Sequence, residues 1–262
     1  MNKIDVVYTF HYSNGIKKAI QRLQCSIRSL IHQDVRIIVV NASKINIANQ
    51  LKEFPVEYYH RPYGETGMEK CVLINFAVKN FVQTPYFFVS DIDLVYPSDY
   101  IKSMLETALE IKNIFKTDVR LIPYVINLQS EYYTSNYKDL MDSKVERYDG
   151  IAPGNGLICT HFFKMIHGYD ERYRGYGPED SNFNERISKI NVFHAADNIK
   201  AFHLYHPPSK NRERFDINTE YNNASRKIFE QFGDIHIPFK PKINRENFKI
   251  IQVNQKGWGE LI

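Results

Sequence analysis

Residues 86–94 read Tyr-Phe-Phe-Val-Ser-Asp-Ile-Asp-Leu, an apolar run that ends in two carboxylates one residue apart. An apolar run of this length is typical of a buried strand. Alternate residues of an extended chain point the same way, so we expect Asp91 and Asp93 to face one ligand while Ile92 faces the core. Two carboxylates at a strand end suit a hard divalent cation that carries phosphate oxygens. The stretch therefore predicts both a central strand and a ligand site at its end.

Strand-like and helix-like segments alternate in the first part of the chain. Apolar runs predict strands over residues 4–10, 36–40, 56–59 and 86–90. Apolar residues at three- and four-residue steps predict helices over 16–30 and 68–81. This alternation favours an α/β fold with a parallel, doubly wound sheet, in which ligands bind outside the carboxyl ends of the strands.

The later part of the chain is expected to be less regular. It contains a predicted helix near 99–112 and a predicted strand near 119–126, followed by a glycine-rich stretch over 147–180 that we interpret as loop-rich. A further helix should begin at Pro178, and a strand over 201–206 should end at Pro207.

Bulk composition excludes several classes of protein. A net charge of +4 over 262 residues is too small to indicate a nucleic-acid partner. The three cysteines are widely spaced, which argues against a disulfide scaffold and against a cysteine metal site. The N-terminus lacks a signal-peptide core, and no apolar stretch has the length of a membrane span. We expect a cytoplasmic protein, with peripheral contact at the inner face of a membrane as the alternative to free solution.

Two histidines near the predicted strand over 201–206 are candidate metal ligands. Neutral imidazole is a common ligand, but His203 and His206 would point to opposite sides of a straight strand. Both could bind one ion only if the chain bends, and Pro207 would favour such a bend. The alternative is a half-buried strand with polar ends. His206 is the better candidate because it lies at the strand end.

A second pair of acids, Glu179 and Asp180, follows the glycine-rich stretch. Acids at a helix N-terminus are stabilised by the helix dipole, so simple capping explains part of this pattern. The functional interpretation makes one carboxylate a general base for a hydroxyl and the other a hydrogen-bond acceptor. Lys70, on the helix before the acid-bearing strand, would either neutralise phosphate or be an ordinary surface charge.

Several of these segments together resemble the β-1,4-galactosyltransferase family. The stretch from Phe87 to Leu94 looks like its strand and D-x-D motif, and Gly168-Tyr169-Asp170 followed by Gly175-Tyr176-Gly177-Pro178-Glu179-Asp180 looks like its G-F…G-W-G-G-E-D segment. His203-x-x-His206 lies where the family has Met-x-x-His. Val40-Asn41-Ala42 and Lys70…Leu73-Ile74-Asn75 also resemble the family, and the ordered set covers about residues 4–215.

The resemblance implies a single GT-A domain over residues 1–215, with a nucleotide-binding half over 1–95 and an acceptor-binding half over 96–215. Residues 216–262 would form a helical or extended appendage. The implied activity is an inverting, metal-dependent transfer from a nucleotide sugar, UDP-linked, to an oligosaccharide or lipid-linked glycan. Mn²⁺ is the implied cofactor, with Mg²⁺ as the alternative.

The resemblance also assigns roles to individual residues. Asp93 and His206, with His203 as a further candidate, would hold the metal on the donor diphosphate. Asp180 would be the base, and Glu179 would orient the sugars. The remaining positions would bind the nucleotide sugar: Thr9, Phe10, His11, Asn41, Lys70, Asp91, Ile92, Tyr176 and Gly177.

Departures from the family pattern limit what the resemblance implies. Tyr176 stands where the family has Trp, and Ser181 replaces an acid, so the family's own sugars are not carried over. A bacterial or viral enzyme of surface polysaccharide synthesis fits the sequence best. The competing interpretations are a metal-dependent hydrolase or phosphoesterase, which would also use clustered Asp and His, and a non-catalytic sugar-binding protein.

Overall fold

Nine strands and seven helices lie in the part of the chain that the computed structural model describes, residues 3–11, 15–62, 70–173, 178–207 and 259. The strands are β1 (Ile4–Phe10), β2 (Val35–Asn41), β3 (Val56–His60), β4 (Tyr86–Ser90), β5 (Leu94–Val95), β6 (Val119–Leu128), β7 (Arg147–Ile151), β8 (Gly156–Cys159) and β9 (Val192–His203). The helices are α1 (Ile16–Leu30), α2 (Ala48–Leu51), α3 (Lys70–Asn80), α4 (Tyr100–Phe115), α5 (Tyr137–Asp142), α6 (Thr160–Met165) and α7 (Glu179–Ser188).

The nine strands form one sheet in the order β3-β2-β1-β4-β8-β6-β9-β5, and β7 pairs with β6 outside this path. Pairing is parallel from β3 through β4 and again between β6 and β9. Because β8 is antiparallel to both β4 and β6, β6 runs in the same direction as β4. Six strands therefore share one direction, and their carboxyl ends meet at one edge of the sheet.

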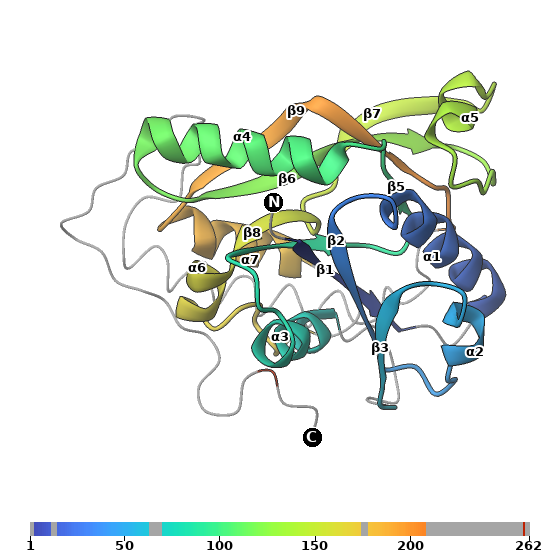
Figure 1. The fold of residues 1–262 in the computed structure, drawn as a ribbon, viewed down its shortest axis with the longest axis horizontal. Helices are drawn as coiled ribbons and strands as arrows, with labels where there is room; N and C mark the ends of the chain where they lie inside the picture. Colours follow the sequence, from blue (N-terminus) through green and yellow to red (C-terminus); the bar gives the residue numbers. More distant parts are fainter. Residues whose placement is uncertain (1–2, 12–14, 63–69, 174–177, 208–258, 260–262) are drawn as a thin grey trace.

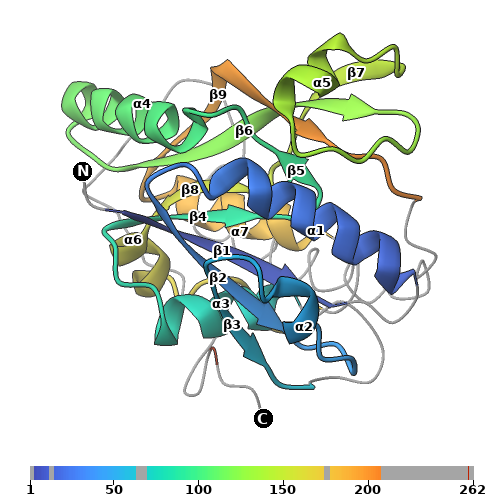
Figure 2. The ribbon, with the colours of Figure 1, turned by 45° about the vertical axis from the view of Figure 1, so that its right-hand side comes forward.

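Helices cover both faces of this sheet (Figures 1 and 2). Alternate residues of β1 point to opposite faces, so Val6 packs with α1 and α4 while Val7 packs with α3, α6 and α7. The apolar stripe of α1 and the apolar centre of β4 explain why these elements form where the sequence predicts them. The predicted mixed α/β class with a mostly parallel central sheet is confirmed.

The segment between β6 and β7, residues 129–146, forms an arm that contains α5 and packs at the end of β9. Leu140 of the arm joins a small apolar cluster with Phe202 and Leu204. The Tyr137 hydroxyl donates to the Lys200 carbonyl at 2.7 Å, and Lys18 of α1 pairs with Glu131 at 2.6 Å. The arm thus supports the chain where β9 ends.

The structure adds detail to two predictions from the sequence. The stretch predicted to be loop-rich, 147–180, also contains β7, β8 and α6, and β8 is a fully buried central strand. The strand predicted over 201–206 begins earlier, at Val192, and ends at His203. Residues 208–258 lie outside the described part of the chain, so most of the predicted appendage does too. Among the described residues, no helix is both long enough and apolar enough to cross a membrane.

Candidate active site

The acid pair lies at the edge where the parallel strands end. β4 stops at Ser90, and the chain then turns instead of continuing as a strand. The Ile92 side chain is buried in the core, 3% exposed, as expected from the sequence, so only its backbone is left to contact a donor. Because the chain turns here, Asp91 and Asp93 contact different neighbours, and the expected alternation along an extended strand is not what places them.

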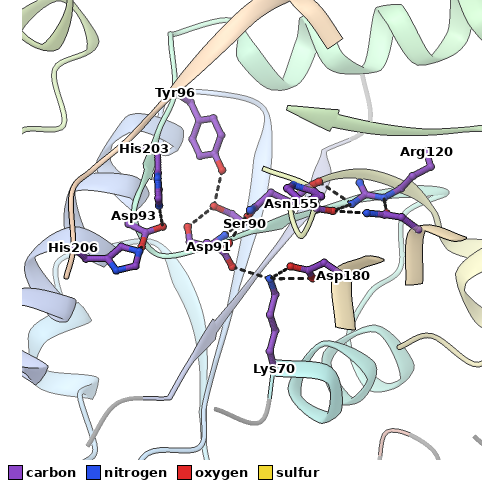
Figure 3. Close-up of polar contacts among 12 residues, drawn as sticks. Lys70, Ser90, Asp91, Asp93, Tyr96, Arg120, Asn155, Asp180, His203 and His206 are labelled. Carbon is purple, nitrogen blue, oxygen red and sulfur yellow. Dashed lines mark hydrogen bonds and ion pairs between the residues drawn. The ribbon is translucent and has the colours of Figure 1, made fainter. Parts of the chain in front are cut away.

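Asp93, His203 and His206 bring three ligand atoms within 4.8 Å of one another (Figure 3). The pairing of β5 with β9 sets Leu94 opposite His203, and the Asp93 carbonyl accepts a hydrogen bond from the Leu204 N–H at 2.8 Å. The Nε2 atoms of His203 and His206 lie 3.6 Å and 3.3 Å from the carboxylate oxygens of Asp93. The chain after β9 bends, as the metal interpretation required, and both histidines face one carboxylate.

This group of side chains fits a divalent cation. Asp93 is 4% exposed, and its Oδ1 atom is buried without a hydrogen-bond donor among the described residues. A buried carboxylate oxygen in that state is costly unless a cation or proton satisfies it. Mixed oxygen and nitrogen donors suit a transition-metal ion better than Mg²⁺, which prefers oxygen ligands.

Lys70, the first residue of α3, lies between Asp91 and Asp180 (Figure 3). Its Nζ atom is 3.2 Å from Asp91 Oδ1 and 3.3 Å from Asp180 Oδ1, and the side chain is only 7% exposed. Burial alone would lower the pKa of the Lys70 ammonium, but the charges of Asp180 and Asp91 outweigh it and hold that pKa well above its usual value. Lys70 is therefore a buried cation that joins the two acid-bearing segments.

Glu179 and Asp180 begin α7 and differ in their surroundings. Glu179 is 5% exposed, and its Oε2 atom has no hydrogen-bond partner in the described part of the chain. Burial, reinforced by the charge of Asp180, raises the pKa of Glu179 to about 8. Burial also raises the pKa of Asp180, although the neighbouring Lys70 opposes that shift. The pair therefore combines a carboxyl group that is protonated at neutral pH with a carboxylate held beside a cation.

The loop before β8 also contacts this site, although no residue of the loop was predicted to do so. The Asn155 Nδ2 atom donates to Asp91 Oδ2 at 2.7 Å, and the Asp91 N–H donates to Asn155 Oδ1. A side chain at Gly154 would collide with the Asp180 carboxylate and the Lys70 ammonium. The signal that could have found this loop is the turn-forming Pro-Gly-Asn-Gly sequence at 153–156.

Arg120, on β6, donates hydrogen bonds to backbone carbonyls of that loop. It is fully buried, and all five guanidinium N–H groups find acceptors: Asn184 Oδ1 and the carbonyls of Leu121, Leu157, Pro153 and Asn155. Burial lowers the pKa of Arg120 to about 10, so the group remains charged at neutral pH. A single arginine in an apolar strand carries no motif, so its role could not be predicted from the sequence.

The predicted nucleoside-binding residues of the first strand lie close to the acid pair. Tyr8 pairs with Ser90, and Thr9 and Phe10 continue β1 beside β2, so His11 is the first residue beyond the strand, near the turn that carries Asp91. Phe10 is buried, whereas Thr9 and His11 are half-buried. Thr9 and His11 are therefore the candidates on this segment whose side chains are partly open to a ligand.

Asn41 is held by hydrogen bonds to its neighbours. Its amide donates to the Ile45 carbonyl and the Tyr58 hydroxyl, and its Oδ1 atom accepts from both the N–H and the hydroxyl of Ser43. All four hydrogen-bonding positions of the side chain are thus occupied by the 43–45 segment and by Tyr58 of β3. The remaining predicted donor-binding residues, Tyr176 and Gly177, lie outside the described residues.

Among solved structures, GalNAc-T7 in complex with UDP, GalNAc and Mn²⁺ is similar at 11% identity with a TM-score of 0.58, covering 97% of this chain and 55% of that chain. TarS from S. aureus, residues 1–349, is similar at 13% identity with a TM-score of 0.48, covering 77% of this chain and 60% of that one. The match therefore spans little more than half the length of either of these two chains, and 37% of the longer TarS chain. The likeness to GalNAc-T7 shows the fold, which is the GT-A fold implied by the motifs. No curated protein sequence matched the chain.

Two family models match the sequence itself. The model described as the N-terminal domain of galactosyltransferase matches residues 141–207, which confirms the resemblance over Glu179, Asp180 and the histidine pair. The model described as glycosyl transferase family 2 matches residues 7–173, well over half of the chain. On that match, the chain belongs to glycosyl transferase family 2.

Proposed function

We propose that this glycosyltransferase moves a sugar from a nucleotide-diphosphate sugar to a hydroxyl of a glycan acceptor, in a metal-dependent reaction that inverts the anomeric carbon. The observation that carries the proposal is the arrangement of two clusters at one edge of the sheet. Asp93, His203 and His206 form one of them, and Asp180 with Glu179 forms the other. Lys70 and Asp91 lie between the two.

The first cluster would hold the leaving group. Asp93, His203 and His206 would bind Mn²⁺, which when bound would stabilise the negative charge that develops on the nucleoside diphosphate. Lys70 would contribute a second positive charge, because its buried ammonium is held in place by two carboxylates. UDP is the nucleotide we propose, supported by the UDP and Mn²⁺ in the GalNAc-T7 complex.

The second cluster would activate the acceptor. Asp180 would accept the proton of the attacking hydroxyl as the new bond forms. Glu179, with its pKa of about 8, would keep its proton at neutral pH and donate a hydrogen bond to a sugar oxygen. Since the base and the metal ligands come from different segments, the attacking and leaving groups can lie on opposite faces of the sugar, as inversion requires.

The proposal extends to the donor sugar, the acceptor and the cellular setting. Tyr176 and Ser181 depart from the galactosyltransferase pattern, so the donor sugar need not be that family's own, and the setting we propose is surface polysaccharide synthesis by a bacterial or viral enzyme. We include in the proposal an oligosaccharide or lipid-linked glycan as acceptor, and a cytoplasmic location with peripheral membrane contact.

A panel of UDP- and GDP-sugars tests the activity directly. The protein is incubated with each donor, Mn²⁺ and a mixture of glycan acceptors, and release of free nucleotide is measured with and without EDTA. We expect one donor to be turned over, only with metal and faster with acceptor, and to give a β-linked product from an α-linked donor. Full turnover in EDTA would show that the reaction does not need a metal ion. An α-linked product would show that the reaction does not invert the anomeric carbon. Release that ignores the acceptor would instead favour the hydrolase.

A further inference from the structure

His203 has a second neighbour on its far side from Asp93. β6 lies beside β9 in parallel register, and Asn127 is paired with His203. The Nδ1 atom of His203 lies 2.8 Å from Asn127 Oδ1, while its Nε2 atom faces Asp93. The imidazole is thus held between an amide on one side and the carboxylate of the metal cluster on the other.

The orientation of the Asn127 amide is fixed by a neighbouring strand. The Asn127 Nδ2 atom donates to the carbonyl of Tyr148 on β7, at 3.4 Å. A carbonyl only accepts, so the amide nitrogen must face Tyr148 and the amide oxygen must face His203. An amide oxygen also only accepts, and His203 Nδ1 must therefore carry the proton. This leaves the Nε2 lone pair directed toward Asp93.

β7 leaves room for this amide. A Cβ atom at Gly150 would lie 2.7 Å from Asn127 Nδ2, closer than side chains pack. No positive φ angle requires glycine at this position, so the missing side chain is explained by the space that Asn127 occupies. The other four residues of β7 are exposed, and Gly150 is the residue of this strand that packs against Asn127.

We propose that Asn127 is a positioning residue for the metal centre: it selects the Nδ1-protonated form of His203 and thereby presents Nε2 to the metal ion. This inference rests on the proposed function, because it assumes that the Asp93 cluster binds Mn²⁺. A ligating histidine commonly donates its other ring N–H to a carbonyl or carboxylate, and removing that partner typically costs about 10–100-fold in metal affinity. His206 has an equivalent partner in the Pro207 carbonyl at 3.0 Å, which no side-chain substitution removes.

The tautomer can be read without any metal. Two-bond ¹H–¹⁵N NMR spectra of the metal-free protein, recorded at about pH 8.5 where free imidazole is neutral, distinguish a proton on Nδ1 from one on Nε2. We expect His203 to be Nδ1-protonated in the wild type and to shift toward the Nε2 form in Asn127→Leu. An Nε2-protonated His203 in the wild type, or an unchanged tautomer in Asn127→Leu, would overturn the proposal.

Mn²⁺ affinity of the full chain, measured by electron paramagnetic resonance, gives the second readout. We expect Asn127→Leu to weaken binding by about 10–100-fold and Gly150→Ala by a smaller factor, because the methyl group displaces the amide. Asn127→Asp keeps an acceptor for His203 and should bind within about threefold of the wild type. Asn136→Ala removes the N-cap of α5, in the arm that links β6 and β7, and serves as the control for lost stability, with Mn²⁺ affinity unchanged.

The outcomes separate this inference from the proposed function. If Asn127→Leu and Asn127→Asp weaken Mn²⁺ binding equally, or as much as Asn136→Ala does, Asn127 is only structural and the inference fails while the metal site stands. If the wild type binds no Mn²⁺, the metal part of the proposed function fails, and the NMR result alone still decides whether Asn127 sets the His203 tautomer.

Discussion

Buried carboxylates lie at both ends of the parallel strands, and the two ends treat them differently. At the amino end of β1, Asp5 is 1% exposed and accepts hydrogen bonds from Arg36 Nε, Gln83 N and Thr84 N at 2.7, 2.7 and 3.2 Å. At the carboxyl edge, Asp93 and Glu179 each keep a buried oxygen without a hydrogen-bond donor among the described residues. Asp5 shows that this fold can supply a buried carboxylate with hydrogen-bond donors. The carboxylate oxygens without donors at the other edge therefore indicate groups that bind a ligand.

The pKa shifts follow the same division. Burial of Asp5 would raise its pKa, but the Arg36 hydrogen bond and two backbone N–H groups outweigh it and lower that pKa. For Glu179 the charge of Lys70 and its own backbone N–H oppose the shift too weakly, and burial raises its pKa to about 8. We therefore expect substitutions at the amino end to cost stability and substitutions at the carboxyl edge to cost function.

Asp93→Ala should have the largest effect. Without its carboxylate the cluster keeps only two imidazoles, and we expect transfer to fall by about 10³-fold, equivalent to about 4 kcal/mol of transition-state stabilisation. Mn²⁺ titration and donor turnover measure the loss, and urea unfolding should show no destabilisation. Asp149→Ala, which removes an exposed acid paired with Lys200, is the matched control for lost charge. Normal Mn²⁺ binding by Asp93→Ala would show that the unsatisfied carboxylate at the carboxyl edge does not serve a metal ion.

Asp180→Asn comes next. The amide keeps the shape of the side chain but cannot accept the hydroxyl proton, so kcat should fall by about 10²-fold. Binding of UDP with Mn²⁺, measured by calorimetry, should stay within about twofold, because the metal cluster is untouched. A kcat close to the wild-type value would exclude Asp180 as the base.

Asp5→Ala is expected to act on stability alone. Removing the carboxylate leaves the Gln83 and Thr84 N–H groups and the Arg36 guanidinium without their acceptor, which should cost about 3 kcal/mol. Urea unfolding measures this loss, and Mn²⁺ affinity should not change. A drop in Mn²⁺ affinity without a drop in stability would contradict the division between the two ends.

Which parts of the fold the sequence predicts depends on how each segment is buried. β1, α1 and β4 carry strong local patterns, either an apolar run or a helical stripe, and they form where expected. β8 has only four residues within a glycine-rich stretch, and it is a central strand because β4 and β6 pair with it on both sides. Such a strand forms because segments distant in sequence pair with it, and its own hydrophobic pattern does not predict it.

The candidate site divides in the same way. Asp93 and His206 could be named as candidates from the sequence because each lies a few residues beyond a strand and belongs to a motif. Asn155 could not, since its role is a contact with Asp91, 64 residues earlier in the chain. The same holds for Asn127, whose effect on His203 requires the parallel register of β6 and β9. Residues that position others act through tertiary contacts, so their sequence context carries little signal.

Glu179→Gln gives the smallest expected effect, and its sign tests the comparison most directly. The ordinary pKa of 4.5 rises to about 8 in the folded protein, so between these values the native state holds a proton that the unfolded state has lost. The contribution of Glu179 to stability is therefore fully present below about pH 4.5 and is lost as the pH rises through 8. Asp5 has the opposite sign, because its lowered pKa gives stability that is lost as the pH falls.

Glutamine carries no titrating proton, so the variant should lose this dependence. Urea unfolding at pH 5.5 and 8.5 should show that wild-type stability falls relative to Glu179→Gln by about 2 kcal/mol, since one pKa unit corresponds to about 1.4 kcal/mol and the shift is shared with Asp180. Asp5→Asn, measured over the same interval, should run parallel to the wild type, because the lowered pKa of Asp5 lies below it. If Glu179→Gln also ran parallel to the wild type, Glu179 would be ionised in the folded protein. It could then no longer act as the proton-bearing partner of Asp180.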